Sequence, residues 1–140
     1  MSKRTQIIVV GCSAFGCSLA LTLSGAGYDV IVMDMLEEAF DQLGDDFDGE
    51  LVTGDGRSAL ALEECGARQA SHLVAATGND ASNLLIAELA SEILGVPHVL
   101  PLVDDDSLVE ILEDMGIDPI CQHRICEEKF FQITGLKPEE

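Results

Sequence analysis

Short apolar runs alternate with helix-like segments along the whole chain. The run IIVV at residues 7–10 leads into a glycine turn, and the run VIVM at 30–33 ends at Asp34. Continuous stretches of Val, Ile and Leu are typical of strands that are buried on both faces of a parallel sheet. The predicted strands cover residues 6–10, 29–33, 50–53, 72–77, 98–103 and 118–121.

The segments between these strands have the pattern of helices. Their predicted ranges are 14–26, 36–43, 57–65, 80–94, 106–115 and 125–133. Asp80 and Asp106 stand where helix N-caps are expected. A glycine follows five of the helices, where a residue with positive φ is favoured. These glycines are Gly27, Gly44, Gly66, Gly95 and Gly116.

Repeated strand–helix units with short connections predict an α/β fold. Right-handed crossovers then give a single Rossmann-like, doubly wound parallel sheet with the strand order 3-2-1-4-5-6 and helices on both faces. The chain has 140 residues and shows no interdomain linker. We therefore expect one domain over residues 1–135 and a short polar tail at 136–140.

The charge of the chain narrows the classes of partner. A formal net charge of −19 argues against nucleic acid, because phosphate backbones are bound by Lys and Arg. The apolar runs are far too short to cross a bilayer, so we expect no direct membrane insertion. The start, MSKR, leads straight into a predicted strand without a secretory pattern, which indicates a cytoplasmic protein.

Five cysteines, an odd number, occur without a C-x-x-C pair. Without a secretory pattern, we expect reduced thiols that pack mostly as small apolar residues. Cys12 is the exception, because a helix N-terminus lowers the pKa of a thiol and makes it more reactive. Cys121, His123 and Cys126 have the chemistry of metal ligands, but a structural zinc usually needs four ligands in paired spacing. No metal site is therefore predicted.

The sequence GCSAFG at residues 11–16 follows the first predicted strand and opens the first predicted helix. Backbone N–H groups and the positive end of a helix in such a turn can face a pyrophosphate. Asp34 follows the next strand, roughly 20 residues beyond the turn, where an acid accepts hydrogen bonds from ribose hydroxyls. Ser13 stands where the middle glycine of this motif usually lies, and its hydroxyl is suited to bind a phosphate oxygen.

Two further segments, TGDG at 53–56 and AATGND at 75–80, end strands at the same edge of the predicted sheet. Ligands bind at the carboxyl ends of parallel strands, near the point where strand order reverses. Arg57 is equally compatible with a surface position and a phosphate contact, whereas no cation directly follows Asp34, which disfavours NADP. The predicted nucleotide-binding residues are Gly11, Ser13, Ala14, Phe15, Gly16, Asp34, Met35, Asp55, Gly56, Thr77, Gly78 and Asn79. Structural roles at turns or helix starts are alternatives for Asp55, Thr77 and Asn79.

Taken together, these segments resemble a known family. The chain is similar to the RCK or KTN (TrkA-N type) nucleotide-binding regulatory domain of the Trk and Ktr potassium transport systems, from residue 6 to about residue 135. The motifs that carry the resemblance are GCSAFGCSLA at 11–20, VIVMD at 30–34, TGDG at 53–56, AATGNDASNLLIA at 75–87 and LEDMGIDPI at 112–120.

The resemblance implies roles for single residues. Gly11, Ser13 and Gly16 match the phosphate loop, Asp34 matches the ribose-binding acid, Asp55 matches the acid on the adenine side, and Thr77 and Asn79 match the far rim. Ala14 stands where many relatives place an arginine that reaches phosphate. The loss of that cation favours NAD or AMP over ATP.

The resemblance also implies a sensor, not an enzyme. Such domains bind NAD(H), the cofactor expected here, or AMP, ADP or ATP. They form a homodimer or a larger ring, and the bound nucleotide gates a membrane-embedded potassium transporter subunit from the cytoplasmic side of the membrane. Phe130, Phe131 and Ile133 in the last predicted helix then form a docking surface for a partner copy.

Two other functions are alternatives. A small nucleotide-binding protein unrelated to ion transport would share the same cradle. An NAD-dependent oxidoreductase fragment is less favoured, because hydride transfer needs an acid–base residue beside the nicotinamide and no lysine lies near the predicted site. A ligand-binding subdomain often follows this domain in the family. The chain is therefore expected to be either a fragment of a longer protein or a single-domain regulatory subunit.

Overall fold

A computed structural model describes residues 5–139, so that the ends of the predicted domain and tail, residues 1–4 and 140, lie outside the described residues. Six strands form one sheet in the order β3-β2-β1-β4-β5-β6, and all neighbouring pairs are parallel. The predicted fold class and strand order are confirmed. The strands are β1 (Gln6–Val10), β2 (Asp29–Asp34), β3 (Glu50–Thr53), β4 (His72–Ala75), β5 (His98–Val103) and β6 (Ile120–Cys121).

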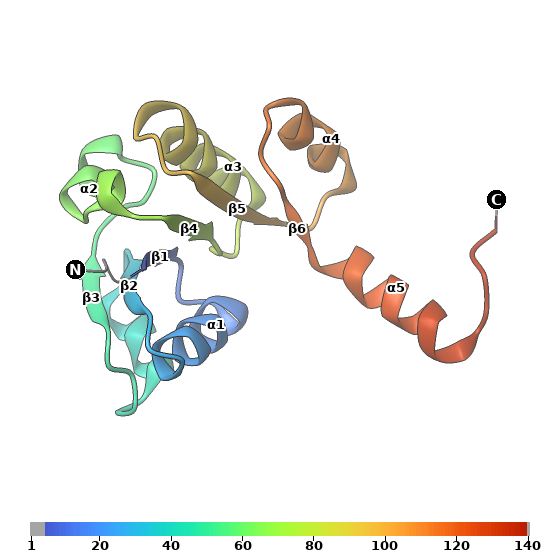
Figure 1. The fold of residues 1–140 in the computed structure, drawn as a ribbon, viewed down its shortest axis with the longest axis horizontal. Helices are drawn as coiled ribbons and strands as arrows, with labels where there is room; N and C mark the ends of the chain where they lie inside the picture. The colour runs from blue at the N-terminus through green and yellow to red at the C-terminus, as the bar shows by residue number, and fades with distance from the viewer. Residues whose placement is uncertain (1–4, 140) are drawn as a thin grey trace.

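Helices lie on both faces of the sheet, as Figure 1 shows. The α-helices are α1 (Ala14–Gly25), α2 (Ala59–Glu64), α3 (Asp80–Glu88), α4 (Asp106–Asp114) and α5 (Gln122–Thr134). Two 3₁₀ segments, η1 (Glu37–Leu43) and η2 (Ala67–Gln69), and one π-helical segment, η3 (Leu89–Ile93), complete the described part of the chain.

The strands divide the core into two layers because their side chains alternate between the faces of the sheet. Val9 and Val32 point to one face, where they pack with residues of α1 and η1. Ile8, Val10 and Met33 point to the other face, where they belong to one larger cluster that also includes residues of α2, α3 and α4. Burial on both faces explains why these strands are continuous apolar runs in the sequence.

The predicted helix ends are confirmed at all five glycines, whose φ angles lie between 69° and 102°. The predicted N-caps at Asp80 and Asp106 are wrong by one residue. The side chain of Asn79 accepts from the amide of Ser82 at 2.8 Å, and that of Asp105 accepts from the amide of Ser107 at 2.9 Å. In each pair the residue just before the predicted cap has the extended backbone that a cap requires.

Several other boundaries are wrong by a few residues. The segment predicted as a helix at 36–43 is the 3₁₀-helix η1, and the helix predicted at 80–94 changes to a π-helical turn at Leu89. The strand predicted at 72–77 ends at Ala75, and the last helix begins at Gln122 instead of residue 125 because β6 runs directly into it. Local propensity does not fix such ends, because tertiary packing decides them.

The expectation of reduced thiols is wrong for Cys12 and Cys17, which form a disulfide. The turn into α1 brings their Cα atoms to 5.1 Å, within the range that a disulfide spans. Cys12 therefore has no free thiol of the predicted reactive kind. Burial raises the pKa of the free Cys65 thiol to about 11, which keeps it protonated and inert.

The last helix, α5, extends from the end of β6 away from the sheet (Figure 1). None of its 13 residues is buried. Ile125, Phe130 and Ile133 are exposed to 55%, 51% and 71%. A helix of this length is marginal in water without tertiary packing. In residues 5–139, no helix has the length and apolar character needed to cross a membrane.

Candidate functional site

The glycine turn between β1 and α1 depends on two positions without a side chain. Gly11 has a φ of 105°, and a Cβ atom there would lie 2.6 Å from the amide nitrogen of Thr77. A Cβ atom on Gly16 would collide with the carbonyl oxygen of Gly11. Since both obstacles are backbone atoms, glycine at position 11 lets the turn approach the loop after β4, and glycine at position 16 lets α1 start close to the carbonyl of Gly11.

Ser13 is the N-cap of α1. Its backbone has ordinary extended angles, φ −79° and ψ 176°, so the serine replaces the usual middle glycine without strain. The hydroxyl oxygen accepts from the amide of Gly16 at 3.1 Å. A hydroxyl that accepts one hydrogen bond still has a proton to donate, and this proton can reach an anion in front of the helix.

Asp34, at the end of β2, ties the turn to the next loop. Its Oδ2 accepts from the amide of Cys12 at 2.8 Å and its Oδ1 from the amide of Leu36 at 2.9 Å. A carboxylate oxygen has two lone pairs, so each oxygen can accept one further hydrogen bond. The carboxylate is therefore oriented by the backbone and keeps one free lone pair on each oxygen.

These groups meet at one cavity of about 570 Å³ at the carboxyl ends of the strands. Nine of the twelve predicted site residues line it: Gly11, Ser13, Asp34, Met35, Asp55, Gly56, Thr77, Gly78 and Asn79. Ala14 and Phe15 line an adjoining hollow of about 180 Å³ instead. Gly16 lines neither hollow and acts through the shape of the turn.

Asp55, predicted to bind on the adenine side, is paired with Arg57 on the same loop. Its Oδ1 accepts from the Arg57 Nε at 3.0 Å, and its Oδ2 from the Nη2 at 3.1 Å. Hydrogen bonds from the side chain and the backbone of Arg57 hold the pKa of the Asp55 carboxyl below its usual value. The pair places one cation and one anion at the cavity wall, both partly exposed.

Thr77 and Asn83 form a buried network behind the far rim of the cavity. The Asn83 side chain is 1% exposed. Its Oδ1 accepts from the Thr77 amide at 2.9 Å and the Thr77 hydroxyl at 2.6 Å. Its amide nitrogen donates to the carbonyls of Thr77 at 3.1 Å and Leu102 at 2.8 Å. All four hydrogen-bonding positions of the side chain are used, so Thr77 has a structural role beside any ligand contact.

Replacing Asn83 with alanine should lower the free energy of unfolding by about 3 kcal/mol, because three groups of the partly buried Thr77 and the buried carbonyl of Leu102 lose hydrogen bonds at once. Chemical denaturation of the purified chain measures the loss. The matched variant, Asn79→Ala, removes an exposed helix cap and should cost only about 1 kcal/mol. Equal losses in the two variants would contradict the role assigned to Asn83.

Asp80 connects the far rim to the loop after β5. Its carboxylate accepts from the amide of Asp104 at 3.0 Å on each oxygen and from the amide of Asp105 at 2.9 Å. Asp80 is also the first residue of α3. These three hydrogen bonds therefore attach the N-terminus of α3 to the segment that leads into α4.

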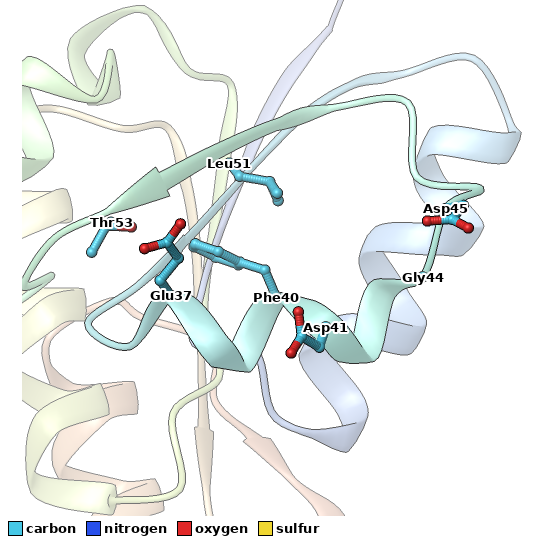
Figure 2. Close-up of a pocket in the computed structure, with 7 residues that line it drawn as sticks. All are labelled: Glu37, Phe40, Asp41, Gly44, Asp45, Leu51 and Thr53. Carbon is cyan, nitrogen blue, oxygen red and sulfur yellow. The ribbon is translucent and has the colours of Figure 1, made fainter.

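A second hollow, of about 440 Å³, lies between η1 and β3. Figure 2 shows that Glu37, Asp41 and Asp45 surround it together with the apolar side chains of Phe40 and Leu51. Three carboxylates repel phosphate, whereas the cavity at the glycine turn presents backbone amides and Arg57, and its two carboxylates, Asp34 and Asp55, already accept hydrogen bonds. Of these two hollows, only the glycine-turn cavity suits a nucleotide.

Residues 7–123 match the family described as the TrkA-N domain. This chain belongs to the TrkA-N domain family. The matched segment runs from β1 to the start of α5 and contains every residue that lines the glycine-turn cavity. The family membership predicted from the sequence motifs is confirmed.

A curated TrkA-N relative is the Trk system potassium uptake protein TrkA of Streptomyces coelicolor. It is 33% identical over 119 residues, which is 85% of this chain and 53% of that protein. The chain thus spans about half the length of this relative.

Solved structures share the TrkA-N fold at lower identity. The Kef CTD of Shewanella denitrificans in its AMP-bound form is 23% identical, with a TM-score of 0.73 over 84% of this chain and 72% of that chain. The GsuK channel bound to NAD is 16% identical, with a TM-score of 0.74 over 89% of this chain and 22% of that chain.

Some residues at the cavity were missed by sequence reasoning. Leu36 and Ile86 supply apolar wall, and Ser82 reaches it from the first turn of α3. The absence of a cation directly after Asp34 in sequence predicts a site that disfavours NADP. In the structure the Arg57 Nη2 lies 3.8 Å from the sulfur of Met35, so the loop after β3 brings a cation beside the end of β2. The sequence predicts that the strand ends share one edge of the sheet, but it does not show which of their side chains approach each other.

Proposed function

We propose that the chain is a nucleotide-sensing regulatory domain of a potassium uptake system, and that it binds NAD(H) or an adenine nucleotide in the glycine-turn cavity. One observation carries the proposal. The Gly11–Gly16 turn, the oriented carboxylate of Asp34 and the ends of β3 and β4 all line one cavity. This arrangement offers amides to a pyrophosphate and a carboxylate to a ribose.

Two comparisons support this assignment. The matching family includes the TrkA potassium uptake protein, and proteins of the same fold are described with bound NAD and with bound AMP. The predicted residues that line the cavity would then divide between phosphate, ribose and base as the resemblance implies. The phosphates would bind at Gly11 and Ser13, and the ribose at Asp34. The base would bind near Met35 and Asp55.

We propose a binding role without catalysis. Among the described residues that line the cavity, none is a lysine, histidine or tyrosine. The Asp55 carboxylate is paired with Arg57, and the Asp34 carboxylate already accepts two backbone amides. Hydride transfer needs a group that exchanges a proton with the substrate, and this cavity supplies no such group from the residues named.

We further propose that a second copy of the chain covers α5 in a homodimer or larger ring. The helix buries none of its residues, yet it carries Ile125, Phe130 and Ile133 as exposed apolar side chains. Packing against a partner would stabilise a helix that is marginal alone. Such an assembly would bind the membrane-embedded potassium transporter subunit at its cytoplasmic face and alter ion flux when nucleotide binds.

Thermal unfolding with added nucleotides tests the binding proposal. NAD, NADH, AMP, ADP and ATP are titrated separately against the purified chain. NAD(H) or AMP should raise the melting temperature most, because Ala14 stands where many relatives place an arginine that reaches phosphate. A ligand at a hundredfold excess over its Kd stabilises the folded state by about 2.7 kcal/mol. The absence of a shift with all five would contradict the binding proposal.

Co-purification tests the transport proposal separately. The tagged chain should retain a membrane-embedded potassium transporter subunit from detergent-solubilised membranes, and the amount retained should change with the preferred nucleotide. A nucleotide-dependent melting shift without such a partner would instead favour a small nucleotide-binding protein unrelated to ion transport.

A further inference from the structure

Three potential metal ligands meet where α5 leaves the body of the protein. Asp106 is the first residue of α4, Cys121 is the last residue of β6, and His123 is the second residue of α5. One donor atom from each lies within 4.8 Å of the other two. None of these residues lines the glycine-turn cavity.

The distances between the donors are close to those of a tetrahedral zinc site. The His123 Nε2 lies 3.0 Å from the Asp106 Oδ1, and the Cys121 Sγ lies 3.7 Å from this Oδ1 and 3.8 Å from the Nε2. Ordinary Zn–S, Zn–N and Zn–O bonds at a tetrahedral angle separate such donors by about 3.3–3.6 Å. Each separation must change by only a few tenths of an ångström to accept an ion.

The donor types favour zinc over calcium or magnesium. A thiolate and an imidazole suit a borderline-soft transition metal, whereas calcium and magnesium take oxygen ligands. The sulfur of Cys121 is buried, while the side chains of His123 and Asp106 are 42% and 56% exposed. An ion could therefore reach the sulfur from solvent, and water could occupy the fourth position.

Arg124 is compatible with this site and orients one of its ligands. Its Nε donates to the Asp106 Oδ1 at 2.7 Å. A carboxylate that binds a metal is commonly held by such a hydrogen bond, because the outer partner fixes its direction. The alternative is a cluster without a metal, in which Asp106 accepts from Arg124 and His123 and the neighbouring thiol of Cys121 only donates a hydrogen bond to Asp106.

We propose that Asp106, Cys121 and His123 bind a zinc ion, with water as the fourth ligand. The sequence suggests Cys126 as a neighbour of this set, but the structure brings in Asp106 from α4 instead. Because the three ligands come from α4, β6 and α5, the ion would cross-link the base of α5 to the body. This zinc site shares no residue with the proposed nucleotide site.

Cobalt(II) titration of the full chain, with zinc competition, tests the proposal. We expect one cobalt per chain, a thiolate-to-cobalt charge-transfer band, visible d–d bands of tetrahedral strength, and displacement by zinc but not by excess magnesium. Asp106→Asn, Cys121→Ser and His123→Gln should each weaken binding more than about a hundredfold, a larger loss than an outer partner of a ligand causes. His123→Gln changes a partly exposed ring and so tests the site without altering the buried core.

Two matched variants control the experiment. Cys126→Ser removes an exposed thiol on α5, and Glu110→Gln removes an exposed carboxylate on α4. Both should bind cobalt like the wild type. The proposal is overturned if the wild type gives no charge-transfer band, or if Cys126→Ser abolishes the band while Asp106→Asn retains it. A chelator removes any bound metal, so nucleotide melting shifts measured in its presence report on the glycine-turn cavity alone.

Discussion

Replacing Asp34 with alanine is expected to remove most of the thermal stabilisation that NAD(H) or an adenine nucleotide gives the wild-type chain. The carboxylate is the group proposed to bind the ribose, and its two oxygens also orient the amides of Cys12 and Leu36. At a hundredfold excess over Kd, the wild type should gain about 2.7 kcal/mol, and the variant at the same concentration should gain little. Thermal unfolding with and without nucleotide measures the difference.

The matched control for this variant is Asp45→Ala. Asp45 is exposed beside the acidic hollow shown in Figure 2, and its loss changes the net charge by the same amount. The nucleotide shift should persist in Asp45→Ala, which excludes a general effect of charge. An Asp34→Ala variant with a full nucleotide shift would remove the ribose assignment. The unliganded variant should itself lose about 1–2 kcal/mol, because two amides lose their acceptor.

The second large effect is expected from Gly16→Ala. The added Cβ atom would collide with the carbonyl oxygen of Gly11, so the glycine turn must open or α1 must shift. We expect the free energy of unfolding to fall by more than about 2 kcal/mol, and nucleotide binding to be lost with the shape of the turn. Chemical denaturation and the nucleotide melting shift measure the two effects.

Gly25→Ala, in the same helix, makes the same substitution in open space. No atom lies within 4 Å of the Cβ that it adds, and the position is exposed at the last turn of α1. Alanine there should leave stability unchanged or raise it by up to about 1 kcal/mol. A Gly16→Ala variant as stable as Gly25→Ala would mean that the turn does not close against Gly11 as described.

The fold was predictable because its signals are local. Continuous apolar strands, glycines after helices and the GCSAFG turn each depend on neighbouring residues, and right-handed crossovers leave few possible strand orders. The wrong details also have a common origin. The N-caps are Asn79 and Asp105, and α5 begins three residues early. Each of these boundaries is decided by backbone geometry, and the neighbouring residue in sequence has a side chain that could serve equally well.

The candidate site was only partly predictable, because strand ends meet in space and not in sequence. Asp34 and the glycine turn follow a known spacing, so the sequence places them together. The approach of Arg57 to Met35, the buried amide of Asn83 and the meeting of Asp106 with Cys121 each join residues at least 6 positions apart. No periodic pattern encodes such pairs, and a single sequence therefore leaves them invisible.

The bridge made by Asp80 has a mechanical consequence. A displacement of the start of α3, at the rim where a ligand would sit, must either pull the 104–105 backbone with it or break three hydrogen bonds. That backbone leads within two residues to Asp106, which holds Arg124 in the first turn of α5. A ligand that displaced the start of α3 would therefore act, through Asp80 and then Asp106, on the first turn of α5.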